Sequence, residues 1–145
     1  TRLLLSVEIW WKELIWSLKI PPKFCHLLWR VAHYILHTRV AFFLRRMVDS
    51  PKSFRCHLWA ESSYHAPWEC PVTQEVWRQL GFPDAANLCD WVMQVWNVLN
   101  YVQQCLFAIG AWTLWKVRNS LCFRDVNTKV VEIICLVKNY EEIFH

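Results

Sequence analysis

The longest regular pattern in this sequence lies between Val102 and Phe123. Apolar and small residues recur there at steps of three and four residues, the spacing of one face of an α-helix. The chain holds only two glycines among its 145 residues, so few positions can supply the backbone freedom that tight turns need. Both features favour helices joined by short connections, and the sequence predicts an all-α fold.

The same spacing predicts six further helices, some with clear end signals. Thr38 is expected to cap one of them, because its hydroxyl can accept a hydrogen bond from an unpaired amide of the first turn. Pro71 suits the first position of another, and Gly81 suits the left-handed residue that ends it. The expected helices cover residues 8–18, 22–36, 38–48, 71–80, 85–99, 102–123 and 128–144.

Residues 56–70, CHLWAESSYHAPWEC, follow no sustained helical or strand period. Within them Cys56, His65 and Cys70 have the spacing C-x8-H-x4-C. Zinc in structural sites takes four ligands, usually thiolates and neutral imidazoles. The helix that starts after Cys70 would also stabilise a thiolate there. We therefore expect a short irregular insertion between helices that is similar to a zinc knuckle.

The other five cysteines show no ligand spacing. The total of seven is odd, and no secretory signal stands at the N-terminus, so a disulfide framework is not expected. We expect these five to be small buried apolar residues: Cys25, Cys89, Cys105, Cys122 and Cys135.

Positive charge gathers in the N-terminal part of the chain. Residues 1–56 carry ten Lys or Arg and three acidic residues, whereas residues 57–145 carry six and nine. Basic residues meet phosphates, and exposed aromatic rings stack on unpaired bases, so this part suits an anionic partner. The alternative is solvated helix faces with the tryptophans in the core. The expected nucleic-acid-binding residues are Lys12, Lys19, Lys23, Arg30, Arg39, Arg45, Arg46, Lys52 and Arg55.

Several motifs occur in the order of a known domain: WKELIWSLKIPPKFCHLLWRVAHYILHTR at 11–39, LRRM at 44–47, HAPWECPVTQEVWRQLG at 65–81 and GAWTLWKVRNSLCF at 110–123. They resemble the zinc-binding domain that follows the reverse transcriptase in plant LINE-type (non-LTR) retrotransposons, together with a helix downstream of it. The resemblance implies a zinc-binding domain over residues 8–81 and a helical connection region over 84–145. It also implies that a polymerase or RNase H domain is a neighbour.

The resemblance implies a ligand set of C-x2-C, His and Cys. The last three ligands map to Cys56, His65 and Cys70, and the first maps to Ser53, which carries no thiol. His37 and Met47 stand where the family has proline and glycine, and together these departures are typical of a degenerate copy.

Zinc binding is therefore one of two alternatives for this stretch. A fourth ligand could come from His57, Glu61 or water. In the other alternative, the knuckle holds no metal and is fixed by packing of Trp59, Tyr64 and Trp68 on the helices.

The sequence argues against an enzyme. It has no Asp-Asp pair of a polymerase, no G-x-S-x-G motif, and its scattered aspartates do not form the carboxylate set of an RNase H. A glycine-rich phosphate loop cannot form with two glycines. The lone histidines His26, His33 and His37 are expected at the surface or core edge. No apolar run reaches the roughly 18 residues of a membrane span.

Two functions remain. The first is a non-catalytic, retrotransposon-derived accessory module that binds RNA or DNA non-specifically through a degenerate zinc knuckle. The second is an inactive helical scaffold without zinc, with the stripe from Trp112 to Trp115 and the last helix as an orphaned interface. An intracellular location is expected, nuclear or cytoplasmic.

Overall fold

The computed structural model of the chain describes residues 10–33, 36–53, 55–62, 68–82 and 96–144. In these ranges the regular structure is helical and no strand occurs, which confirms the all-α prediction. The chain forms the π-helical turn η1 (Trp10–Leu14), the 3-10 turn η2 (Ile15–Ser17), α2 (Pro22–Ala32), α3 (Arg39–Leu44), α4 (Pro71–Gln79), the 3-10 turn η4 (Trp96–Val98), α6 (Tyr101–Arg124) and α7 (Val130–Phe144).

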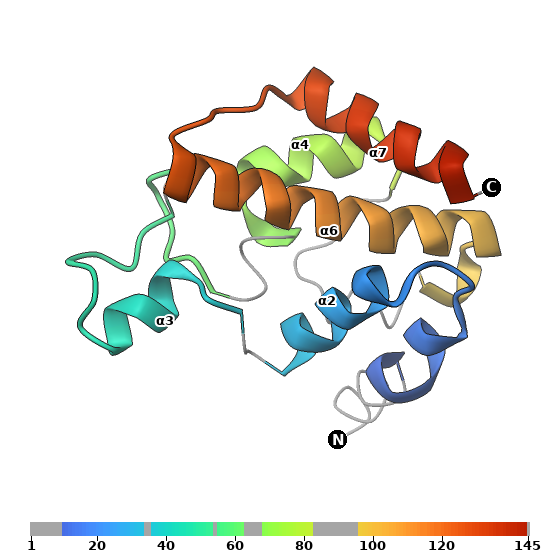
Figure 1. Ribbon diagram of the computed structural model, residues 1–145, viewed down its shortest axis with the longest axis horizontal. Coiled ribbons are helices and arrows are strands. Elements are labelled where there is room, and N and C mark those ends of the chain that lie inside the picture. The colour runs from blue at the N-terminus through green and yellow to red at the C-terminus, as the bar shows by residue number, and fades with distance from the viewer. Residues whose placement is uncertain (1–9, 34–35, 54, 63–67, 83–95, 145) are drawn as a thin grey trace.

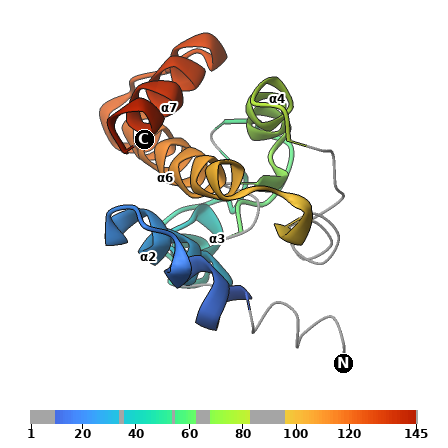
Figure 2. The same cartoon turned by 90° about the vertical axis from the view of Figure 1, so that its right-hand side faces the viewer.

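Helix α6 is the central element. It packs against α2 on one side and α7 on the other, while α4 contacts α7 (Figures 1 and 2). One hydrophobic core takes residues from α2, α4, α6 and α7, among them Phe24, Trp77, Phe107 and Val137. The described parts of both predicted domains therefore share this core. The predicted division at residues 81–84 stays a prediction.

A glycine allows α4 to approach α6 closely. A Cβ atom added at Gly110 would lie 2.8 Å from the ring of Trp77. That indole is buried and stacks on Phe107 of α6, with ring centroids 4.9 Å apart. Gly110 is therefore required by packing rather than by backbone conformation.

The end signals of α4 and α6 are satisfied. Pro71 starts α4, and Gly81, with φ of +89°, ends it as predicted. At the start of α6, Asn100 and Gln103 form a reciprocal capping box that satisfies two backbone amides. The predicted helix at 85–99 lies mostly outside the described residues.

Three predicted helices differ from the structure. The helix expected over 22–36 ends at Ala32, because His33 forms its C-cap. Thr38 caps α3 as expected, accepting from the amide of Ala41 at 3.3 Å, but the helix stops at Leu44 rather than residue 48. Arg46 adopts a left-handed φ of 58°, and the amide of Met47 closes on Phe42 O at 2.9 Å, so the chain turns away. The described part of 8–18 forms η1 and η2 instead of an α-helix, and it ends at Ser17 because the backbone is extended at Leu18.

Candidate metal centre

The irregular segment forms a tight ribbon beside α3, which we call the knuckle: residues 51–53 and 55–61. Its two sides meet in one antiparallel bridge between Lys52 and Ala60. The amide of Ser53 donates to Trp59 O at 2.8 Å, and the amide of Glu61 donates to Pro51 O at 2.8 Å. Figure 1 shows that α3 and the segment after it project beyond one end of α6.

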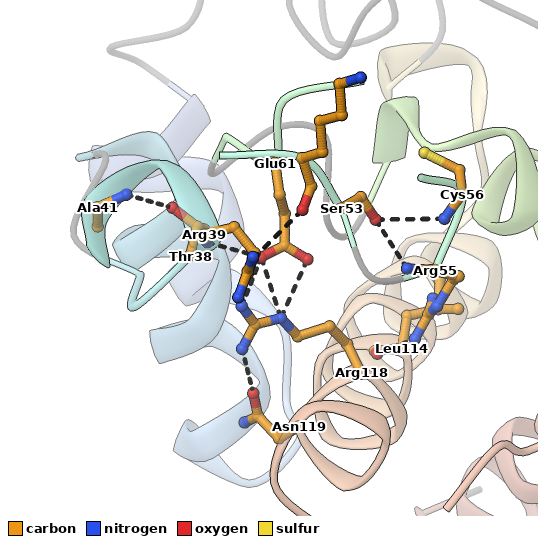
Figure 3. A network of polar contacts seen from close by, with 11 residues as sticks. Thr38, Arg39, Ala41, Ser53, Arg55, Cys56, Glu61, Leu114, Arg118 and Asn119 are labelled. Carbon is orange, nitrogen blue, oxygen red and sulfur yellow. Dashed lines mark hydrogen bonds and ion pairs between the residues drawn. The ribbon is translucent and has the colours of Figure 1, made fainter. Parts of the chain in front are cut away.

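The side chain of Ser53 lies inside the knuckle and is 1% exposed. Its hydroxyl oxygen accepts hydrogen bonds from the amides of Arg55 at 3.1 Å and Cys56 at 3.4 Å (Figure 3). The Ser53 hydroxyl therefore accepts from the amides of the second and third residues after it. The residue that lacks a thiol still points into the centre of the turn.

The thiol of Cys56 sits in the same kind of arrangement. Partial burial raises its pKa, but the amides of Leu58 and Trp59 and the side chains of Ser53 and Cys70 donate to it or lie within hydrogen-bonding reach. Together these contacts outweigh burial, and the pKa of Cys56 falls below its ordinary value. Cys56 is only half-buried, so the thiolate is accessible.

Cys70 stands at the N-cap of α4, next to Cys56. Burial raises its pKa, and the nearby Cys56 adds to the increase, while the amides of Val72 and Thr73 and the charge of Arg55 lower it. The net direction is upward. The start of α4 therefore favours a thiolate at Cys70 as we expected, but burial has the larger effect on the pKa.

Three of the four expected ligand positions therefore share one geometry. Ser53, Cys56 and Cys70 each face amides two and three residues ahead, and the two thiols are adjacent. His65 lies outside the described residues. In the described ranges no group of three His, Cys, Asp or Glu side chains is placed to hold a metal ion. The positions fit a zinc knuckle, and the donor set is one thiol short of it.

Glu61 has another role than the fourth ligand. Its carboxylate accepts from Arg118 Nε at 3.1 Å and 3.0 Å and from the amide of Arg39 at 2.9 Å (Figure 3). Side chains of Glu61 and Arg118 are each 2% exposed. This buried ion pair ties the end of the knuckle to both α6 and the start of α3. Its carboxylate is committed, so Glu61 does not fit the role of metal ligand.

Arg55 is also directed inward, contrary to its predicted role on the nucleic-acid surface. Its Nη2 donates to Leu114 O of α6 at 3.3 Å, and burial lowers the pKa of the guanidinium. The side chain thus ties the knuckle to α6. Its Nη1 is buried without a hydrogen-bond partner among the described residues, beside the thiol of Cys70 and the carboxylate of Glu61.

His57 is exposed and lines a cavity that none of the described ligand positions lines. It has a left-handed φ of 57°, and the cavity has a volume of about 400 Å³ and is also lined by Leu121, Cys122 and Asp125. Its amide closes the turn by donating to Ser53 O at 2.9 Å.

Most of the other predicted nucleic-acid-binding residues reach solvent. Lys12, Lys19, Lys23, Arg45, Arg46 and Lys52 are exposed, and Arg30 and Arg39 are partly exposed. They do not form one patch on a single element, since they come from η1, α2, α3 and the loops. Lys23 lies over the ring of Trp112, 4.3 Å from its centroid.

The tryptophans divide between the core and the knuckle. Trp68 is buried and packs on Trp77 and Phe107, as the packing alternative expects. Trp59, by contrast, is 60% exposed and does not hold the knuckle on the helices. Tyr64 lies outside the described residues.

The stripe at Trp112 and Trp115 is not an orphaned interface. Trp115 is buried, and Trp112 packs edge-on against Phe24 and Tyr140, because α2 and α7 cover this part of α6.

The buried ion pair of Glu61 and Arg118, which fastens the knuckle to α6, was not predicted from the sequence. The only signal was the Arg-Asn pair in the α6 motif, and nothing local connected it to a glutamate 57 residues away.

A family model described as zinc-binding in reverse transcriptase matches residues 5–77, half of the chain. The match includes Ser53, Cys56, His65 and Cys70, and it ends at Trp77, before α6. No curated protein and no solved structure matches the chain significantly. No helix in the described ranges is long and apolar enough to cross a membrane.

Proposed function

Because the chain belongs to the family of zinc-binding domains of reverse transcriptases, we propose that it is a non-catalytic accessory module that binds RNA or DNA without sequence specificity. In this proposal it derives from a plant LINE-type retrotransposon, and its zinc knuckle is degenerate. An adjacent polymerase or RNase H domain is the partner within the longer protein.

The projecting surface of α3 and the knuckle supports this proposal most directly. We call residues 38–61, where described, the arm. The arm carries five basic and two acidic residues, and its exposed apolar side chains include Phe43, Met47 and Trp59. Exposed rings among cations are costly for solubility but suit a partner with phosphates and unpaired bases.

Salt dependence of binding to a labelled oligonucleotide tests the proposal. Each lost phosphate contact reduces the slope of log K against log salt by about 0.7 for a single strand. Replacing both Arg45 and Arg46 by alanine should therefore weaken binding and flatten the slope by about 1.4. The matched control replaces Lys129 and Lys138, which are exposed at α7. The proposal would be contradicted if affinity did not fall as the salt concentration rises, or if the two double variants weakened binding equally.

Zinc binding by this copy is a separate part of the proposal. The support is that the hydroxyl of Ser53, at the position where the family resemblance implies a first cysteine, accepts from two backbone amides, so a thiol there would complete the cysteine set. We expect Ser53→Cys to bind one zinc per chain tightly and the natural chain to bind it weakly, with Ser50→Cys as the control. Metal content after purification measures this. Equal zinc in all three proteins would show that Ser53 is not the missing position.

The helical-scaffold alternative has one observation in its favour. Val131 and Ile143 of α7 are 68% and 70% exposed, so this helix presents apolar side chains to solvent. Sedimentation over a range of concentrations separates the two functions. Reversible association with no affinity for oligonucleotides would favour the scaffold.

A further inference from the structure

A second cavity lies where the arm meets the end of α6. It has a volume of about 200 Å³ and is lined by Arg39, Phe42, Val48, Arg118, Cys122 and Phe123. Two segments form it: α3 with the turn after it, and the last turns of α6. The Glu61–Arg118 pair described above holds these segments together. The cavity is distinct from the ligand positions at Ser53, Cys56 and Cys70, none of which lines it.

The aromatic lining is unusual for a surface without a partner. Phe123 is 66% exposed although it stands in a helix whose other large residues are mostly buried. The guanidinium carbon of Arg118 lies 5.8 Å from its ring centroid. Phe42 is partly exposed and stacks on His37, with an angle of 13° between the rings. Both phenyl rings therefore contribute apolar faces at the cavity without being enclosed in the core.

The charge around the cavity favours an anionic ligand. Arg118 is neutralised by Glu61, but Arg39 also lines the wall, and the arm carries a net charge of +3. Arg124, which directly follows Phe123, is exposed but is offset by the exposed Asp125 next to it, so the excess positive charge comes from the arm. A ligand with a flat apolar part and a negative part matches these surroundings better than the apolar side chain of a protein partner does.

A nucleotide has both parts, and the cavity is smaller than the roughly 300 Å³ at which sites for drug-sized ligands begin. We propose that this cavity receives one unpaired base of a single-stranded nucleic acid whose phosphates lie along the arm. The inference rests on the proposed nucleic-acid binding and adds a preference to it. A base in a duplex is stacked and paired, so it cannot enter, and single strands bind better.

The test compares three labelled probes of equal charge: a single-stranded oligonucleotide, the same strand with abasic sites, and a duplex of half that length. Loss of one base-stacking contact weakens binding about five- to 150-fold. We expect the natural protein to prefer the single strand with bases over both other probes by a factor in this range. Phe123→Ala should remove the preference while leaving binding to the abasic strand unchanged.

Two controls separate the cavity from the fold and from general affinity. Phe123→Trp keeps a stacking ring and should retain the preference. Ile143→Ala removes an equally exposed apolar side chain from α7 and should change nothing. A second readout is alkylation of Cys122, which lines the cavity: the single strand should slow its reaction with N-ethylmaleimide but not that of Cys135, which is exposed on α7.

The possible outcomes distinguish the base site from general nucleic-acid binding. Equal affinity for the strands with and without bases would overturn the base site and leave nucleic-acid binding standing. An unchanged preference in Phe123→Ala would overturn it as well, and would leave the cavity to a protein side chain. If none of the probes binds, the proposed function and this inference fail together.

Discussion

The buried pair of Glu61 and Arg118 allows a quantitative test of how the knuckle is held. Both side chains are 2% exposed. The carboxylate of Glu61 accepts hydrogen bonds from the guanidinium of Arg118 and from the backbone amide of Arg39. Removing one partner of such a pair leaves the other charge buried and costs about 3–5 kcal/mol. Domains of this size are stable by about 5–15 kcal/mol, so either single variant should be severely destabilised.

The two single variants are not expected to cost the same. Arg118→Met strands the carboxylate with one amide donor, and we expect a loss near the upper end of about 3–5 kcal/mol. Glu61→Gln keeps an oxygen for the Arg39 amide but strands the guanidinium, so its loss should lie near the lower end. In the double variant no charge is buried, and the cost should be well below the sum of the two.

Urea unfolding followed by tryptophan fluorescence measures these free energies. The control is Arg124→Met, an exposed arginine on the same helix, which should stay within about 0.5 kcal/mol of the natural chain. Hydrogen exchange should speed up first at the knuckle amides in both single variants. Single losses as small as the control's, or a double loss equal to their sum, would refute the argument that this pair fastens the knuckle.

Three further predictions concern single residues. Gly110→Ala should destabilise the protein by about 1–3 kcal/mol in urea unfolding, despite the better helix propensity of alanine, because the new methyl meets the ring of Trp77 at 2.8 Å; a more stable variant would contradict the packing. Burial raises the pKa of Cys25 from 9.0 to about 11, so the buried neutral thiol stabilises the fold below pH 9 and this contribution disappears as the pH rises through 11. At about 1.4 kcal/mol per unit, the natural chain should lose more stability than Cys25→Ala over that interval, by at most about 3 kcal/mol, as thermal unfolding measures; parallel losses would count against it. Near neutral pH, iodoacetamide should modify Cys56 faster than the exposed Cys135, as followed by mass spectrometry of the peptides, since hydrogen bonds lower the pKa of Cys56; the reverse order would argue against those hydrogen bonds.

The parts of the fold that could be predicted are those with local signals. Pro71 and Gly81 define α4 because a proline suits a first turn and a glycine tolerates a left-handed φ, whatever lies around them. The early end of α3 escaped prediction because Arg46, an ordinary residue, adopts the left-handed conformation there. Arginine has no preference for a positive φ, so residue type alone does not indicate that α3 ends there.

The sequence predicted that the thiols of Cys56 and Cys70 lie together, but not the contacts that hold the knuckle. The spacing of Cys56 and Cys70 was enough to place two thiols together, as the structure shows. The inward direction of Arg55 and the burial of Glu61 depend on α6, which lies more than fifty residues further along the chain. Charged residues are normally read as exposed, and only the tertiary structure reveals the exceptions.

The contacts around Ser53 indicate that the fold of the knuckle does not depend on zinc binding. A serine hydroxyl accepts the same two amides that a thiolate would accept there, so no buried donor is left unsatisfied by the change. The bridge at Lys52 and the Glu61–Arg118 pair hold the rest of the knuckle through contacts that involve no metal ligand. We therefore expect a chain with Ser53 to keep the order of the knuckle and to bind zinc more weakly than a chain with a fourth ligand would. Since the arm's cations and the cavity at Phe123 involve no metal ligand, the proposed nucleic-acid binding should persist when a chelator is added.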